Sequence, residues 1–367
     1  MTPRQPVRIG IVGSGNIAHG QHLPVIRSLR DRARVVAAMD VDIERARKLA
    51  EEWDIPAVYA ELDAMLSAAS PDLVIVCTPP VAHHDAVIEC LAAGSWVWCE
   101  KPPTLSLAEY DDIARHEQPG GPYVSYVFQH RFGSGAQRLR QQIAAGTLGR
   151  PLVAVCNTLW YRPHAYFDAP WRGRWATEGG GPTMGHGIHQ IDLALYLLGD
   201  WTEVVAAMGT LDREVETEDV SMAAALLHNG AMMSVVNSLL SPRETSYLRF
   251  DFTSATVELT HTYGYDNSNW SWTPVANLDP AVAEGWPPTQ NVRSGHAAQL
   301  SALIEAFHAG DRPPASGADG RRSLEFISGL YKSAITRQPV RRDSLIPDDP
   351  FYHALNGETG TTAAEGR

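Results

Sequence analysis

The 367-residue sequence lacks the marks of several protein classes. Its four cysteines show neither the spacing of a metal site nor that of a disulfide framework. The formal net charge is −12, which argues against binding to nucleic acid or to an anionic membrane. No apolar run approaches the length of a membrane span, and the first predicted strand starts at Val7, too early for a secretion signal. We therefore expect a cytoplasmic protein with reduced thiols and with no nucleic-acid or membrane partner.

Lysine is also scarce, because the 30 basic residues include only Lys48, Lys101 and Lys332. A lysine in this chain therefore marks a position where arginine would not serve. Lys101 follows a predicted strand, next to Glu100. Lysine can hydrogen-bond a substrate hydroxyl and exchange a proton when its pKa is lowered, which arginine cannot do. We expect a functional role for Lys101 rather than that of a surface charge.

A glycine-rich turn follows the apolar strand predicted at Val7–Val12. It fits the pattern G-x-G-x-x-A and consists of Gly13, Ser14, Gly15, Asn16, Ile17 and Ala18. In a dinucleotide site, Gly13 permits the tight turn, and Gly15 lets the backbone approach a pyrophosphate. The pyrophosphate would bind at the N-terminus of the helix that follows. The turn therefore predicts a dinucleotide-binding site.

The acid that such a site requires is Asp40, at the end of the second apolar run. A carboxylate there can accept both ribose hydroxyls of NAD and would repel the 2′-phosphate of NADP. Asp40 is followed by Val41 and Asp42 rather than by basic or small polar residues. The expected cofactor is therefore NAD rather than NADP.

The first third of the chain alternates short apolar runs with amphipathic stretches, which is typical of βαβ units. We expect an NAD-binding Rossmann domain at residues 1–127, with a doubly wound parallel sheet and its ligand at the carboxyl ends of the strands. Residues 128–342 are instead expected to form an α+β domain on a mostly antiparallel open sheet, with a hairpin turn at Asn229-Gly230. Residues 343–367 are expected to form a frayed tail. The fold class is therefore α/β followed by α+β.

The most promising chemistry of the second domain lies in Glu178–Asp192, which reads EGGGPTMGHGIHQID. A helix there would carry His186, His189 and Asp192 at spacings of three residues, so neighbouring pairs share a face. His189 has a pKa range suited to removing the proton of an alcohol. The spacing is not the i, i+4 pattern of a zinc helix, and we expect no metal. A purely structural histidine remains the alternative.

Aromatic and arginine residues alternate between Trp160 and Trp175, and Tyr161 belongs to this loop. A second loop contains Trp270, Trp272 and Trp286. Aromatic faces and guanidinium groups suit the faces and hydroxyls of a sugar ring. These side chains are equally suited to packing between domains or subunits. Both interpretations stay open.

Almost the whole chain, from Val7 to about Val340, resembles the Gfo/Idh/MocA family of NAD(P)-dependent sugar, cyclitol and polyol oxidoreductases. The matching motifs are GSGNIA, TPPVAH at Thr78–His83, EKP at Glu100–Pro102 and GGGPTMGHGIHQID at Gly179–Asp192. The resemblance implies that the cofactor is lined by Thr78, Pro79, His83 and Glu100, with Gln129 near the nicotinamide. It also implies that Lys101 and His189 are the catalytic residues. Arg131, in the same FQHRF stretch as Gln129, is a further candidate for substrate binding, as are Tyr161, Trp175, His186 and Asp192.

One position departs from the family pattern. Many members carry an aspartate four residues before the catalytic histidine, and this chain has Gly185 there. His186, one position on, is a candidate for the polar role of that acid.

Three functions agree with the sequence. The first is an NAD-dependent dehydrogenase acting on a secondary alcohol of a sugar, glycoside or cyclitol. The others are an NAD-dependent glycoside-cleaving enzyme and a non-catalytic sugar or dinucleotide sensor. Apolar residues at nearly every position of Met222–Leu227 and Ala231–Val236 further predict a subunit interface, since a sheet with one solvated face would alternate. The resemblance implies a homodimer or homotetramer built on this sheet.

Overall fold

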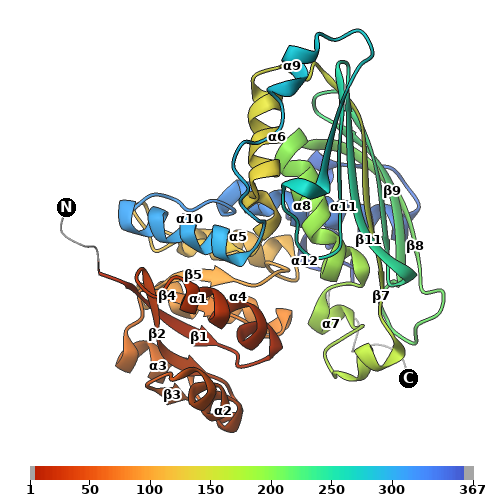
Figure 1. Cartoon of the computed structure of the whole chain (residues 1–367). Coiled ribbons are helices and arrows are strands. Elements are labelled where there is room, and N and C mark those ends of the chain that lie inside the picture. The colour runs from red at the N-terminus through yellow and green to blue at the C-terminus, as the bar shows by residue number, and fades with distance from the viewer. Residues whose placement is uncertain (1–4, 359–367) are drawn as a thin grey trace, which may run out of the picture. The chain divides into compact units, whose positions relative to one another are not determined.

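A computed structural model describes residues 5–358 of the chain. The chain divides into two compact units, whose elements are labelled in Figure 1. The first comprises residues up to Thr104 together with Glu109–Val127 and His296–Arg321, and the second comprises Leu105–Ala108, Phe128–Gly295 and the residues from Arg322 on. Within residues 5–358, none of the helices combines the length and the apolar character needed to cross a bilayer.

The first unit is built on a sheet of six parallel strands. Their order is β3-β2-β1-β4-β5-β6, which confirms the expected doubly wound sheet, with the change of direction between β1 and β4. The four residues of β4 and of β5 are all buried, as strands covered on both faces require. The strands are β1 (Val7–Val12), β2 (Ala33–Met39), β3 (Val58–Tyr59), β4 (Leu73–Val76), β5 (Trp96–Cys99) and β6 (Val124–Tyr126). The helices between them are α1 (Leu23–Ser28), α2 (Ile43–Trp53), α3 (Leu62–Ala69), α4 (His83–Ala92) and α5 (Leu107–His116).

A late segment of the chain belongs to this first unit. Helix α10 (His296–Ala309) follows the second domain's strands in sequence, and the sequence placed it in that domain. Its residues Leu300, Leu303 and Ile304 are buried in the same hydrophobic cluster as Ile9 and Trp96. Burial of this apolar face accounts for the return of the chain to the first unit.

The second unit contains a sheet of eight strands in the order β13-β12-β11-β7-β10-β9-β8-β14. Only β7 and β10 pair in parallel, so the sheet is mixed and mostly antiparallel, as expected. Helix α8 packs against β7 and β11 on one face of the sheet (Figure 1). The strands are β7 (Pro151–Tyr161), β8 (Trp201–Gly209), β9 (Val220–Leu227), β10 (Met232–Ser238), β11 (Leu240–Phe252), β12 (Ala255–His261), β13 (Trp270–Pro274) and β14 (Val340–Arg341). The helices are α6 (Ser134–Ala144), α7 (Trp175–Glu178), α8 (Ile188–Leu198), α9 (Pro280–Glu284), most of α11 (Gly317–Thr336) and α12 (Pro350–His353).

The segment after residue 343, expected to fray, is ordered as far as residue 358. Helix α12 starts at an N-cap, where the Asp349 side chain accepts a hydrogen bond from the backbone N–H of Phe351. Phe351 and Tyr352 are buried, and Asp349 pairs with Lys332. A cap, an ion pair and two buried rings hold this segment, and composition alone did not reveal them. Residues 359–367 of the expected tail lie outside the described part.

Candidate functional site

The glycine turn after β1 is crowded at Gly13 and has free space at Gly15. Gly13 has φ of +93°, and a Cβ there would lie 2.8 Å from the carbonyl carbon of Cys77, so only glycine fits. Two residues on, a Cβ at Gly15 would meet no atom of the described residues within 4 Å apart from those of its chain neighbours. The chain is helical from Asn16, first as a π-helical turn at Ala18–His22 and then as α1. The space at Gly15 and the helix start beside it fit the pyrophosphate of a dinucleotide.

Two hydroxyl oxygens at this turn lack a hydrogen-bond partner among residues 5–358. Ser14 Oγ and Thr78 Oγ1 are both buried and make no hydrogen bond with any described residue. Thr78 follows β4, the strand next to β1 across the change of sheet direction. Buried polar atoms are normally hydrogen-bonded, so these two oxygens are suited to a ligand at the carboxyl ends of the strands.

Asp40 lies against the same turn. Its Oδ2 accepts a hydrogen bond from the backbone N–H of Ser14 at 2.8 Å, and its Oδ1 accepts one from the N–H of Asp42 at 3.0 Å. These bonds fix the carboxylate beside the turn, where the ribose of NAD is expected. The residues present therefore fit NAD.

An Asp40→Ala variant is expected to narrow the preference for NAD over NADP, because it removes the negative charge that repels a 2′-phosphate. Titration of both cofactors by fluorescence measures the two dissociation constants. Asp42→Ala is the matched control, because Asp42 is exposed and caps α2. Tighter binding of NADP than of NAD by the unmodified protein would contradict the assignment.

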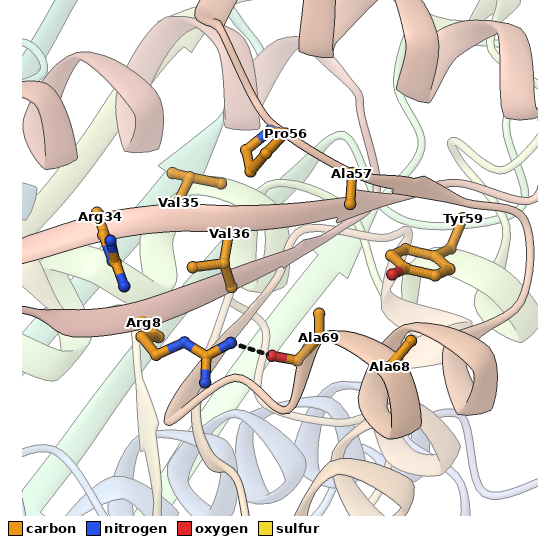
Figure 2. A pocket seen from close by; sticks show the side chains of 9 residues that line it. All are labelled: Arg8, Arg34, Val35, Val36, Pro56, Ala57, Tyr59, Ala68 and Ala69. Atoms are coloured by element: carbon orange, nitrogen blue, oxygen red, sulfur yellow. Dashed lines mark hydrogen bonds between the residues drawn. The ribbon is translucent and has the colours of Figure 1, made fainter.

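The hollow in Figure 2 is a separate feature of the first unit, with a volume of about 460 Å³. Its lining includes Arg8 and Arg34, which are register neighbours on β1 and β2, and Arg8 donates a hydrogen bond to the carbonyl oxygen of Ala69. No residue of the glycine turn lines it. The full lining is Arg8, Arg34, Val35, Val36, Pro56, Ala57, Tyr59, Ala68 and Ala69. We therefore do not identify this hollow with the cofactor site.

His83 connects the loops that follow β4 and β5. Its Nδ1 lies 2.8 Å from the carbonyl oxygen of Pro102, and its Nε2 lies 3.0 Å from that of Thr78. Burial lowers the pKa of His83, although the carbonyl contacts oppose the shift. His83 thus holds together the loop that carries Thr78 and Pro79 and the loop that carries Lys101.

Glu100 is the centre of a buried cluster that the sequence did not predict. Its Oε1 accepts a hydrogen bond from His22 Nε2 at 2.7 Å and lies 3.6 Å from His296 Nε2, while Oε2 accepts one from the backbone N–H of Lys101 at 3.2 Å. Burial alone would raise the pKa of Glu100, but the two histidines hold it well below its usual range. Potential ligand atoms of His22, Glu100 and His296 lie within 4.8 Å of one another. A separation of 2.7 Å is that of a hydrogen bond, so we interpret the cluster as an anchor for Lys101.

The glycine run before His189 is held by a buried acid that the sequence also missed. Glu218 accepts hydrogen bonds from the backbone N–H groups of Gly181 at 3.0 Å and Thr183 at 3.1 Å, and from the hydroxyl of Tyr331 at 2.9 Å. A Cβ at Gly181 would lie 1.8 Å from the carbonyl oxygen of Glu218. Burial raises the pKa of Glu218 despite these bonds. The absence of a side chain at Gly181 thus lets the backbone approach Glu218 closely.

His189 lies in a group of aromatic rings. The ring of His130 packs edge-on against that of His189, with centroids 5.3 Å apart, and His130 also contacts His261 and Tyr265. Burial lowers the pKa of His261 to about 4. These neighbours fix the ring of His189, which is 7% exposed. His130 lies between Gln129 and Arg131 in the FQHRF stretch, but neither His130 nor His261 was predicted from the sequence as a site residue.

His186 faces a different group. The hydroxyl of Tyr166 lies 3.4 Å from His186 Nε2, and the ring of Trp160 packs edge-on against it. Arg172 hydrogen-bonds to Tyr166 and donates to Glu178 Oε1 at 3.1 Å. Burial raises the pKa of Tyr166 to about 12. The structure thus brings His186 together with part of the predicted aromatic loop.

Two candidates for substrate binding are paired with each other instead. Arg131 donates to both carboxylate oxygens of Asp192, and Ser323 donates to Asp192 at 2.7 Å. Arg131 and Asp192 are 2% and 1% exposed. A buried bidentate pair of this kind is part of the scaffold, so a direct contact with substrate is not supported for either residue. By contrast, Gln129 Oε1 is buried and accepts no hydrogen bond from the described residues.

The tryptophans of the two aromatic loops mostly pack within the second unit. Trp175 donates to the carbonyl oxygen of Glu216 and packs edge-on against Tyr331. Trp270 and Trp286 are buried. Tyr161 is 41% exposed, and its ring lies beside the guanidinium of Arg213. These three tryptophans pack inside the second unit, which differs from the packing between domains or subunits that the sequence left open, and Tyr161 keeps an accessible ring.

Comparison with known proteins agrees with this geometry. The family model described as "Oxidoreductase family, NAD-binding Rossmann fold" matches residues 7–127, and the model of the GFO/IDH/MocA C-terminal domain matches residues 136–262. The chain is 29% identical to D-glucoside 3-dehydrogenase of Escherichia coli strain K12, over 90% of this chain and 96% of that protein. It is 26% identical to myo-inositol 2-dehydrogenase of Thermotoga maritima, over 93% of this chain and 100% of that protein.

A solved structure has the same architecture. The WlbA dehydrogenase from Bordetella pertussis, crystallised with NADH and UDP-GlcNAcA, superposes with a TM-score of 0.81 at 25% identity, covering 92% of this chain and 99% of that one. The family models and the named relatives identify an NAD-binding oxidoreductase. The chain belongs to the Gfo/Idh/MocA family. These comparisons support the first of the three expected functions and lend no support to glycoside cleavage or to a sensor.

Proposed function

We propose that this protein is an NAD-dependent dehydrogenase that oxidises a secondary alcohol of a sugar, glycoside or cyclitol. The observation that carries the proposal is its similarity, along nearly the whole chain, to relatives named D-glucoside 3-dehydrogenase and myo-inositol 2-dehydrogenase. The chain also keeps the lysine and the histidine that such chemistry needs, Lys101 and His189.

The two residues have distinct roles. Lys101 donates a hydrogen bond to the hydroxyl oxygen of the substrate and stabilises negative charge that develops there. His189 removes the hydroxyl proton, for which a neutral imidazole is suited near pH 7. The bound nicotinamide supplies the hydride acceptor. The cofactor would be held by the turn at Gly13–Ala18, by Asp40 and by Thr78, with Gln129 as a further polar contact.

A screen of NAD against a panel of glycosides, aldoses and inositols tests the proposal. Formation of NADH is followed by absorbance, with NADP as the parallel arm. Substrate-dependent NADH is the expected result. Failure of every member of the panel, with a protein that binds NAD, would contradict the proposed function.

We further propose that the protein is a cytoplasmic homo-oligomer built on the open face of the second sheet. Val153, Met232 and Leu226 are register neighbours on β7, β10 and β9, and each is more than 40% exposed. Met222 and Val205 extend the same kind of surface onto β9 and β8. Such a contiguous apolar surface is typical of a subunit interface. The four cysteines are free and buried, which agrees with a reducing compartment.

Sedimentation velocity at micromolar concentration is expected to show a dimer or a tetramer. Met232→Asp should shift the protein toward the monomer, because it places a charge in the centre of the apolar face. Val282→Asp makes the same kind of change on helix α9 and should leave the sedimentation coefficient unchanged. A monomer at micromolar concentration would refute the interface.

A further inference from the structure

We propose that His261 is a positioning residue for His189 and that it acts through a hydrogen bond to Gln190; this inference rests on the proposed function. The first observation is a buried polar row that crosses the sheet of the second unit. A sheet face covered by a helix is normally apolar, so a row of buried polar side chains indicates a specific role. Its five members are register neighbours on β9, β10, β7, β11 and β12, each at most 6% exposed: Ser221, Asn237, Thr158, Ser246 and His261.

Two members of this polar row contact the π-helical turn at Thr183–Gly187, which leads into α8. The hydroxyl oxygens of Thr183 and Ser221 are 2.6 Å apart. Asn237 donates to the same oxygen of Ser221 at 3.1 Å, and a Cβ at Gly187 would lie only 2.0 Å from Asn237 Oδ1. The turn therefore rests directly on β9 and β10, with a glycine at the point of closest approach.

His261 makes the corresponding contact with helix α8. Its Nε2 lies 3.2 Å from Oε1 of Gln190, and both side chains are buried. Burial lowers the pKa of His261 to about 4, so the ring is neutral near pH 7, and we assign its single N–H to Nε2, which donates to the amide oxygen. The bond ties α8 to strand β12 and fixes the rotation of the helix about its axis.

The rotation of α8 decides the direction of His189. Gln190 is the next residue of the helix, and consecutive residues of an α-helix project about 100° apart. A helix held at Gln190 therefore presents His189 in one direction. The ring of His130 contacts both His261 and His189, with centroids 5.1 Å and 5.3 Å away, so the three imidazoles form one packed group. The donor at position 261 thus sets where the imidazole of His189 meets a substrate hydroxyl.

Three variants separate the hydrogen bond from the packing of the ring. His261→Gln keeps a donor, because the amide nitrogen of glutamine reaches about as far from the backbone as Nε2 of histidine. His261→Phe keeps a ring but has no donor, and Gln190→Leu removes the acceptor.

With the best substrate of the panel, His261→Phe and Gln190→Leu are each expected to lower kcat by about 10- to 100-fold, because a catalytic group displaced by about 1 Å loses up to about 10²-fold. KM and the affinity for NAD should change little. His261→Gln should keep most of kcat. The double variant His261→Phe/Gln190→Leu should lose no more than either single variant, because both changes break the same bond.

His228→Phe is the matched control, because His228 is exposed in the same unit, and it should leave kcat unchanged. Hydrogen exchange measured by mass spectrometry follows helix α8 without turnover, and it should be faster in His261→Phe and Gln190→Leu but not in His261→Gln. The thermal midpoint is measured for every variant, since a merely structural residue would lower it and leave kcat per folded enzyme unchanged.

Full kcat per folded enzyme in His261→Phe, or a loss in His261→Gln as large as in His261→Phe, would overturn the positioning role. Lack of turnover by the unmodified protein on the whole panel would instead refute the proposed function, and this inference with it.

Discussion

A Lys101→Met variant is expected to lose a factor of about 10²–10⁴ in kcat while its affinity for NAD stays unchanged. Methionine keeps most of the apolar stem of lysine but cannot donate a hydrogen bond or carry a charge. Lys101 follows Glu100, whose carboxylate accepts the backbone N–H of Lys101 and is itself held by His22. The substitution leaves these backbone contacts intact, so the protein should fold normally. Steady-state kinetics and NAD titration by fluorescence measure the two quantities.

His189→Ala is expected to lose a similar factor in kcat. If Lys101 and His189 act on the same hydroxyl, the double variant should lose less than the product of the two single losses. Lys48→Met serves as the matched control, because Lys48 is an exposed residue of helix α2. Near-normal turnover in both single variants would overturn the catalytic assignment.

Two roles are to be distinguished for His186: a contribution to catalysis, and structural support of the aromatic loop. Its contacts with Tyr166 and Trp160 connect it to the aromatic loop. If His186 contributes to catalysis, His186→Ala should lower kcat with little change in NAD affinity. If it only supports the loop, the free energy of unfolding should fall and kcat per folded enzyme should hold. Comparison of kcat with the thermal midpoint of the same variant decides between them.

The folded protein is expected to lose about 1.4 kcal/mol of stability between pH 7.5 and pH 5.5 from the buried His261 alone. Burial lowers the pKa of His22, His83 and His261, the last to about 4. In the unfolded chain each has a pKa near 6.5, so below that pH the unfolded state binds more protons than the folded state. The pKa values of His22 and His83 are lowered in the same direction, so these two histidines add to the loss from His261. The loss from His261 alone is a measurable part of the ~5–15 kcal/mol that stabilises a typical domain.

Urea denaturation at a series of pH values measures the slope of the free energy of unfolding against pH. His261→Gln should remove about 1.4 kcal/mol of the stability loss between pH 7.5 and pH 5.5, because it removes the imidazole of His261. His228→Gln should leave the slope unchanged, since His228 is exposed. A free energy of unfolding that is constant, or that rises, on acidification to pH 5.5 would contradict the buried neutral histidines.

Local pattern was sufficient to predict the type of each sheet, but not the unit to which every helix belongs. Strand β1 begins and ends where the apolar pattern predicts, at Val7 and Val12, and the turn predicted at Asn229-Gly230 joins β9 to β10 with φ of +85° at Gly230. The hydrophobic periodicity of an element and the residue preferences of a turn depend on a few neighbouring residues, so both can be recognised in a single sequence. The return of α10 to the first unit depends instead on burial of Leu300 and Leu303 among residues nearly 300 positions earlier in the chain. No local signal carries that information.

The candidate site likewise combines features that local sequence spacing reveals with contacts between distant segments that it does not reveal. The glycine turn and Asp40 are recognisable because their spacing is fixed by the turn, and the hydrogen bond from Ser14 joins them in the structure. The contact of His261 with Gln190 was not recognisable, because His261 reaches helix α8 from strand β12. A contact made between distant segments leaves no fixed spacing in the sequence. The same holds for His296 beside Glu100, which comes from α10.

The central claim is that this protein transfers a hydride between a sugar or polyol carbon and NAD. The most direct test uses the best substrate of the panel, deuterated at the carbon whose hydroxyl is oxidised, and mass spectrometry of the NADH formed. We expect one deuterium in each NADH and a matching amount of ketone product. NADH without deuterium, or loss of substrate with no ketone and no net NADH, would contradict the claim.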